Sequence, residues 1–115
     1  MIPRPIIFDC DPGTDDVVAL LMAFAYPEKL NILGVTTVGG NVPLSYTSRN
    51  ALQVVELVGR DTPVFAGCDR PLVRPYYLPA EEIHGKTGPV TANVIFWSLF
   101  KRVRIIKSTA CSDCT

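Results

Sequence analysis

The sequence lacks an excess of either charge, a long apolar run and any repeated or low-complexity segment. Basic and acidic residues number eleven each, so the formal net charge is zero and gives no indication of a nucleic-acid partner. The longest late apolar stretch, between Val94 and Phe100, is far shorter than the roughly 20 residues of a membrane span. No basic segment followed by an apolar one marks a signal peptide. We therefore expect a cytoplasmic protein that binds neither nucleic acid nor membrane.

Cysteine and histidine are too few and too scattered to form a zinc site. The chain has four cysteines and one histidine, and Cys111 and Cys114 form a CxxC pair near its end. A zinc site needs a second pair of ligands, which Cys68 and His84 do not provide. Without a secretion signal, the cysteines are expected to be free thiols in a reducing compartment.

The residues that are present predict one α/β domain. At 115 residues and 48% hydrophobic content, the chain can bury a core. The apolar patterns predict alternating strands and helices at 3–8, 14–26, 30–38, 44–58 and 63–66. Thr14 is expected to cap the first helix, and Pro27 to end it. The order predicts a parallel, Rossmann-like βαβαβ sheet with right-handed crossovers.

Four carboxylates lie within eight residues, directly after the first predicted strand. They belong to Asp9, Asp11, Asp15 and Asp16. One or two of them would suit the positive end of the following helix, but four like charges are unfavourable unless a cation lies among them. Ca²⁺ and Mg²⁺ take oxygen ligands, and Asp11 and Asp16 can direct oxygens to one point above the strand end. The rest of an EF-hand pattern is absent, so that motif is excluded.

Three polar segments follow the three predicted strands. They are the acidic turn, Gly39-Gly40-Asn41 and the loop beginning at Gly67. Because the carboxyl ends of parallel strands share one edge of the sheet, these segments are expected to converge into a ligand site.

Several motifs resemble the inosine-uridine preferring nucleoside hydrolase family. The resemblance covers residues 1–88, in the family's order and spacing. Its motifs are Asp9-Cys10-Asp11-Pro12-Gly13-Thr14-Asp15-Asp16, Gly34-Val35-Thr36-Thr37-Val38-Gly39-Gly40-Asn41, Thr47-x-Arg49-Asn50-Ala51, Val64-Phe65-Ala66-Gly67-Cys68-Asp69-Arg70-Pro71-Leu72 and Ile83-His84-Gly85-Lys86-Thr87-Gly88.

The resemblance implies Ca²⁺-dependent hydrolysis of the N-glycosidic bond of ribonucleosides, by a protein that forms oligomers. Asp11 and Asp16 would bind Ca²⁺, and Asp11 would accept the proton of the attacking water. Asp15 would bind the ribose hydroxyls and Asn41 would support the sugar. Two further residues complete the implied site: His84, as a catalytic and substrate-binding residue near the ribose and base, and Asp9, as a supporting acid.

Two other interpretations stay open. An Asp-x-Asp after a first strand also marks phosphatases of the haloacid dehalogenase type, although Pro12 interrupts their pattern here. The chain is also compatible with a non-catalytic fragment that binds a full-length relative and alters it.

The last 27 residues differ from the preceding ones. Residues 1–88 hold seven Lys/Arg against ten Asp/Glu, whereas residues 89–115 hold four against one. We expect 89–115 to be a divergent tail, from a frameshift or alternative exon, and the family domain to be truncated at Gly88. The catalytic set would then be incomplete, Ca²⁺ binding weak and the chain inactive alone. The first strand would have an open apolar edge, which Val103-Arg104-Ile105-Ile106 or an earlier tail segment could cover.

Overall fold

A computed structural model describes residues 1–71, 73, 86 and 105–107 of the chain. The elements, in order, are β1 (Arg4–Cys10), α1 (Thr14–Phe24), β2 (Leu30–Thr37), α2 (Leu44–Leu57), β3 (Val64–Ala66) and β4 (Ile105–Lys107). The predicted sequence of three strands and two helices over the first 66 residues is confirmed. Within the described part of the chain, no helix is long and apolar enough to cross a bilayer.

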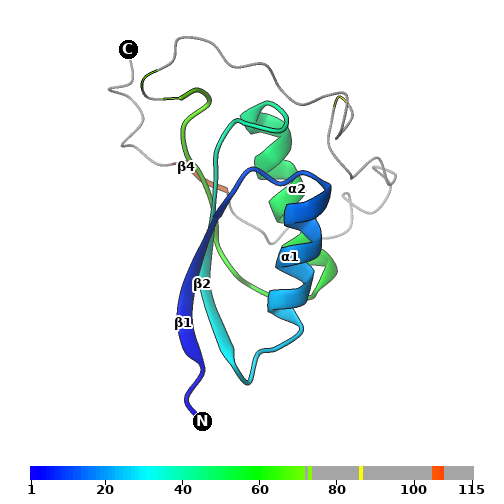
Figure 1. Cartoon of the computed structure of the whole chain (residues 1–115), viewed down its shortest axis with the longest axis vertical. Helices are drawn as coiled ribbons and strands as arrows, with labels where there is room; N and C mark the ends of the chain where they lie inside the picture. Colours follow the sequence, from blue (N-terminus) through cyan, green and yellow to red (C-terminus); the bar gives the residue numbers. More distant parts are fainter. Residues whose placement is uncertain (72, 74–85, 87–104, 108–115) are drawn as a thin grey trace.

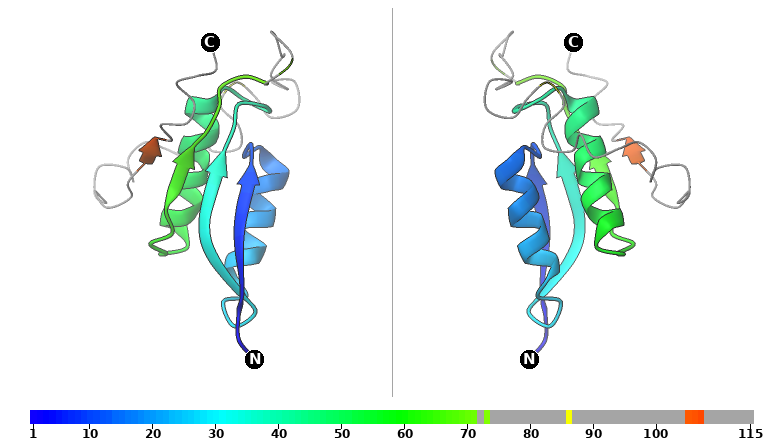
Figure 2. Two further views of the ribbon diagram at one scale, coloured as in Figure 1. Left: turned by 90° about the vertical axis from the view of Figure 1, so that its left-hand side faces the viewer. Right: turned by 90° about the vertical axis from the view of Figure 1, so that its right-hand side faces the viewer.

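The strands form one parallel sheet in the order β1-β2-β3-β4. From β1 to β3 the chain advances in one direction, so two right-handed crossovers place α1 and α2 on the same face. Figures 1 and 2 show both helices on this face. The described elements therefore form two layers.

The core lies between the sheet and the two helices. Leu20 of α1, Val35 of β2, Val55 of α2 and Val64 of β3 are all 0% exposed. Phe8 of β1, which is partly buried, packs against this cluster. The core thus joins β1, β2, β3 and both helices, and it holds the strand ends in fixed relative positions.

The opposite face of the sheet carries exposed apolar side chains. Ile7 of β1 is 64% exposed and Leu33 of β2 is 52% exposed. Leu33 is the extra residue of a β-bulge, because Ile6 pairs with Ile32 while Ile7 pairs with Gly34. No described element covers this face.

The outer side of β1 has backbone groups that β2 does not pair. The Arg4 N–H donates to the Lys29 carbonyl at 2.8 Å, and the Cys10 carbonyl accepts from the Val38 N–H at 3.2 Å. Even-numbered residues of β1 therefore face β2, and Ile7 and Asp9 direct their N–H and C=O groups away from it. Among the described strands, β1 is an edge strand.

Three local expectations are corrected. The first strand continues to Cys10, so Asp9 belongs to it rather than to the turn. The N-cap of α1 is Gly13, in extended conformation, because the first helical bond runs from the Val17 N–H to the Gly13 carbonyl; Thr14 is inside the helix. The segment at Ile105–Lys107 pairs with β3, at the side of the sheet opposite β1, so it does not cover the β1 edge.

We predict that Leu20→Ala lowers the free energy of unfolding by about 2–5 kcal/mol, because it opens a cavity in the core shared by both layers. Met22→Ala, at a position 61% exposed on the same helix, is the control and should cost less than about 0.5 kcal/mol. Urea unfolding followed by circular dichroism measures both. Equal losses would contradict the described packing.

Candidate functional site

The three polar segments meet at the carboxyl edge of the sheet. The Gly39 N–H donates to the Cys68 carbonyl at 2.9 Å, and the Gly67 N–H donates to the Thr37 carbonyl at 2.8 Å. The bond between Val38 and Cys10 links the second segment to the end of β1. The convergence predicted from the strand order is confirmed for the described residues.

Asp11 and Asn41 are joined by two hydrogen bonds. The Asn41 backbone N–H donates to Oδ2 of Asp11 at 2.7 Å, and the Asn41 side chain donates from Nδ2 to the Asp11 carbonyl at 3.0 Å. Gly40 permits this approach, because a Cβ there would lie 2.2 Å from Asp11 Oδ2. Asn41 therefore orients Asp11. The amide oxygen and the second amide hydrogen of Asn41 are the groups of this side chain that could bind a substrate.

The structure also brings Asp16 to Asp11. The Asp11 backbone N–H donates to Oδ2 of Asp16 at 3.1 Å, across the turn that starts α1. Burial raises the pKa of Asp16 above its ordinary value, and the charge of Asp11 raises it further. Asp15 adds a smaller effect in the same direction. Two partly buried carboxylates thus repel each other at one place.

The same negative charges also affect the Cys10 thiol. Its pKa is raised to about 12, first by burial and then by the charges of Asp16, Asp9 and Asp11. The thiol is therefore protonated and unreactive at neutral pH. Cys10 and Cys68 form no disulfide bond, as expected, whereas Cys111 and Cys114 lie outside the described residues.

Asp11 and Asp16 fit part of a calcium site. Their carboxylates are oxygen donors, and repulsion between them would be relieved by a cation. Within residues 1–71 and the other described positions, no group of three or more His, Cys, Asp or Glu is arranged to hold a metal. Two carboxylates supply at most four of the roughly six to eight oxygens that Ca²⁺ takes.

The three remaining predicted site residues are Asp15, Asp9 and His84, and the structure does not bring all of them to Asp11 and Asp16. Asp15 is exposed in the first turn of α1, beside Asp16. Asp9 is exposed on β1, where its Oδ1 accepts a hydrogen bond from the Thr36 hydroxyl at 2.6 Å. His84 lies outside the described residues. The roles assigned to these three residues stay predictions.

Three buried polar residues of α2 contact the strand ends, and the sequence reasoning gave them no role. Thr47 donates to the Val38 carbonyl at 2.9 Å, Ser48 bonds the Thr37 hydroxyl at 2.8 Å, and Asn50 donates to the Pro12 carbonyl at 3.0 Å. The sequence does contain a pattern that indicates these contacts, because the three polar residues occupy the helix face that also carries the apolar Ala51 and Val55.

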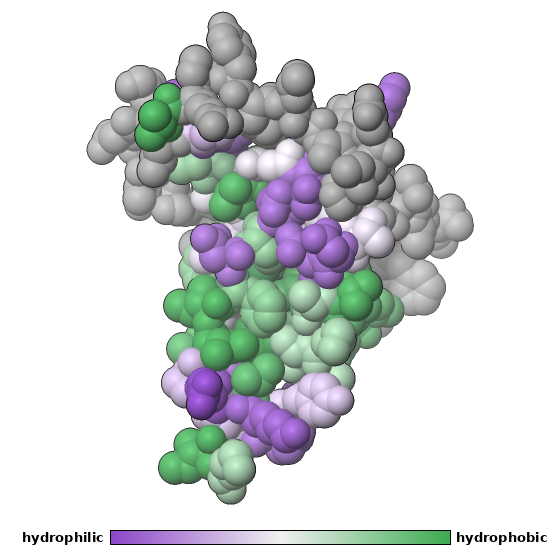
Figure 3. All heavy atoms as spheres, viewed as in Figure 1, coloured by the Kyte–Doolittle hydropathy of each residue, from purple (hydrophilic) through white to green (hydrophobic). Residues whose placement is uncertain are grey.

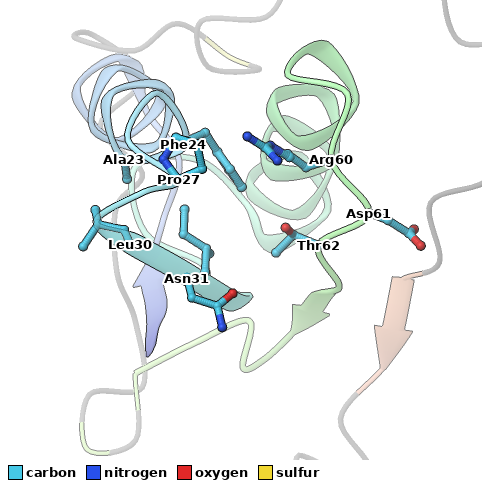
Figure 4. A pocket seen from close by; sticks show the side chains of 9 residues that line it. Ala23, Phe24, Pro27, Leu30, Asn31, Arg60, Asp61 and Thr62 are labelled. Atoms are coloured by element: carbon cyan, nitrogen blue, oxygen red, sulfur yellow. The ribbon is translucent and has the colours of Figure 1, made fainter. Parts of the chain in front are cut away.

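The surface agrees with this placement. Figure 3 shows hydrophilic side chains gathered near the turn between β1 and α1, above an apolar band, with a second hydrophilic group lower down toward the N-terminus. A hollow of about 350 Å³ lies at the other edge of the sheet, lined by residues that include Phe24, Asn31, Arg60 and Thr62 (Figure 4). It contains no carboxylate pair, and the Asp61 side chain points away from the others. We therefore assign the candidate site to the carboxyl edge.

Fold and site together define an α/β protein whose acidic residues gather at the carboxyl edge of a parallel sheet. The family model of the inosine-uridine preferring nucleoside hydrolases matches residues 6–107. The chain belongs to that family. The match passes Gly88 and includes β4, whereas alignments with individual relatives cover 84 to 88 residues, so the division of the chain at Gly88 stays a prediction.

Individual relatives agree with the family. The chain is 48% identical over 88 residues to the inosine-uridine preferring nucleoside hydrolase of Crithidia fasciculata, covering 76% of this chain and 27% of that protein. It is 50% identical over 86 residues to the pyrimidine-specific ribonucleoside hydrolase RihA of a Shewanella strain, covering 74% and 26%. A solved plant nucleoside hydrolase, PpNRh1, matches with a TM-score of 0.69 and 33% identity, covering 80% of this chain and 30% of that one. The chain thus spans about a quarter of the length of the curated relatives it matches.

We predict that Asp16→Asn raises the stability of the chain at pH 7 in the presence of a chelator. The folded state holds the Asp16 proton more tightly than the unfolded state, so this carboxyl favours folding below pH 3.8 and opposes it as the pH rises through its raised pKa. The amide oxygen of Asn can still accept the Asp11 N–H.

Thermal unfolding at pH 3.5 and pH 7 measures the effect, and the difference between variant and wild type should shrink at the lower pH. Asp15→Asn, in the same helical turn but exposed, is the control and should give a smaller gain or a loss. A destabilised Asp16→Asn variant at pH 7 would contradict the repulsion.

Proposed function

We propose that the chain supplies the Ca²⁺-binding edge of a site that hydrolyses the N-glycosidic bond of ribonucleosides. The observation that carries this proposal is the contact between Asp11 and Asp16 at the end of β1, within a chain of nucleoside hydrolase family sequence. Asp11 and Asp16 would hold the ion, Asp15 and Asn41 would bind the ribose, and His84 would lie near the ribose and base. The relatives' names differ in base preference, so the proposed substrate class is ribonucleosides in general.

The reaction joins a water oxygen to C1′ of the ribose and breaks the bond from C1′ to the base nitrogen. A bound Ca²⁺ would supply charge that lowers the pKa of the attacking water and orients the ribose hydroxyls. Asp11 accepts the proton of that water, which suits a carboxylate held in a fixed direction by Asn41. The departing base takes up a proton, and the products are ribose and free base. The sugar passes through an oxocarbenium-like state, as in other glycoside hydrolysis.

The chain by itself is expected to bind Ca²⁺ weakly and to be inactive. Asp11 and Asp16 offer too few oxygens for a complete site, and no residue that could protonate the departing base is assigned in the described part of the chain. We expect a dissociation constant of about 10⁻⁴ to 10⁻³ M, as in open calcium sites.

Isothermal titration of the purified chain with Ca²⁺ tests the proposal. Binding should be detectable, and Asp11→Asn should weaken it by roughly tenfold or more, because one carboxylate of the pair is lost. Asp61→Asn, an exposed residue at the other edge of the sheet, is the control and should leave the affinity unchanged.

Absence of any binding, or equal affinity in wild type and Asp11→Asn, would overturn the assignment of the ion to Asp11. Release of ribose from inosine and uridine is measured in parallel. Ca²⁺-dependent release by the chain alone would contradict the expected inactivity while supporting the reaction.

A second candidate function is binding to a full-length relative without catalysis. The outer side of β1 favours it, because Ile7 and Asp9 have backbone groups that β2 does not pair, and the exposed side chains of Ile7 and Leu33 lie on the uncovered face beside them. An edge of this kind accepts an added strand. The partner would be another chain of the same family, forming a hetero-oligomer.

Mixing the chain with an intact family hydrolase tests this function. We expect light scattering to show a complex with the summed mass, and the hydrolase activity to change. Ile7→Lys should abolish both effects, because it places a charge in the new contact, whereas Val18→Lys, at an exposed position of α1, should not. An unchanged mass and activity in the wild-type mixture would exclude this function.

A further inference from the structure

The middle of α2 buries polar side chains at an unusual cost. Thr47, Ser48 and Asn50 are 0%, 4% and 1% exposed. Asn, Ser and Thr weaken a helix interior, because their side chains compete for backbone hydrogen bonds. Burial of such groups is unfavourable unless each finds a partner. In α2 each of the three residues has a partner at the carboxyl edge of the sheet, so this face of the helix contacts the strand ends as well as the core.

Asn50 makes the contact with the longest reach. Its Nδ2 donates to the Pro12 carbonyl at 3.0 Å, over 38 residues of sequence. Pro12 is itself fully buried and lies between Asp11 and the first turn of α1. The Asp11 N–H donates to Asp16 across this turn, but Pro12 has no N–H and adds no donor of its own. The bond from Asn50 fixes the turn from outside.

The helix that carries Asn50 is itself anchored to β2. Ser48 bonds the Thr37 hydroxyl, and Thr47 donates to the Val38 carbonyl. Through α2, Asn50 therefore connects the acidic turn to the end of β2. Just beyond that end, Asn41 holds the Asp11 carboxylate. Asn41 holds the side chain and the carbonyl of Asp11, and Asn50 holds the carbonyl of the residue that follows.

We propose that Asn50 is a positioning residue, which fixes the acidic turn so that the Asp11 and Asp16 carboxylates stay together despite their repulsion. The role in cation binding rests on the proposed function, whereas the role in fixing the turn does not. The proposed function assigns neither the ion nor the substrate to Asn50. Its loss should loosen the turn and weaken Ca²⁺ binding while α2 and the core persist.

The experiment compares Asn50→Leu with Ser48→Ala in the full chain. Asn50→Leu keeps the branching at Cγ, in a larger and apolar side chain, and removes the donor to the turn. Ser48→Ala removes a buried hydrogen bond from the same helix but not from the acidic turn, and the bond from Thr47 to the Val38 carbonyl keeps α2 attached to the end of β2. A purely structural role predicts that both variants lose stability and that neither changes the turn selectively.

Amide hydrogen exchange in chelator gives the first readout. In Asn50→Leu, exchange of the Asp11 and Asn41 amides should accelerate at least about tenfold relative to the core amide of Val35, and in Ser48→Ala the ratio should stay near the wild-type value. The second readout is Ca²⁺ titration, where Asn50→Leu should raise the dissociation constant at least about fivefold and Ser48→Ala should leave it unchanged. Equal exchange ratios in the two variants would overturn the proposal.

These measurements distinguish failure of the proposed calcium function from failure of the proposed role of Asn50. If wild type binds no Ca²⁺, the proposed calcium function fails and the exchange ratios still decide whether Asn50 fixes the turn. If Asn50→Leu does not fold, the wild-type chain is used: a scalar coupling across the hydrogen bond from Asn50 Nδ2 to the Pro12 carbonyl carbon supports the proposal. Absence of that coupling, with fast exchange of the Asn50 side-chain amide, overturns it.

Discussion

The arrangement of the strand ends depends on the paired hydrogen bonds between Asp11 and Asn41. Through them the end of β1 is attached to the loop after β2, and the Asp11 carboxylate takes one direction. The attachment requires Gly40, because any side chain there would occupy the position of the carboxylate oxygen. Asp16 then meets Asp11 from the first turn of α1. The carboxylates of Asp11 and Asp16 therefore lie together because the backbone of the acidic turn has a fixed conformation. Hydrogen bonds from Asn41 and from polar side chains of α2 hold this conformation.

Much of this could be predicted from the sequence, because the responsible signals are local. Continuous apolar runs marked the strands, and the second helix, expected at 44–58, is found at Leu44–Leu57. The meeting of the three polar segments followed from the rule that parallel strands end at one edge. The proximity of Asp11 and Asp16 followed from their positions on either side of one turn.

The remainder depended on contacts that sequence spacing does not reveal. The bond from Asn50 to Pro12 joins residues far apart in sequence, and a polar residue in a helix usually faces solvent, so no role was assigned to it. The pairing of Ile105–Lys107 with β3 involves only three residues, too few for a periodic pattern. The cap at Gly13 was missed because Thr14 is the better capping residue by type, although the backbone reverses one residue earlier.

The bond between Thr36 and Asp9 has a consequence for the uncovered face of the sheet. Midway along β1 and β2 this face presents the apolar side chains of Ile7 and Leu33, and nearer the carboxyl ends it presents the Asp9 carboxyl group, which accepts a hydrogen bond from the Thr36 hydroxyl. Any layer packed on this face must match the change from apolar to polar side chains. It needs apolar groups over Ile7 and Leu33, and hydrogen-bond donors or water over Asp9. The sheet thus specifies the orientation of a covering layer, and a reversed one would bury a carboxylate against hydrocarbon.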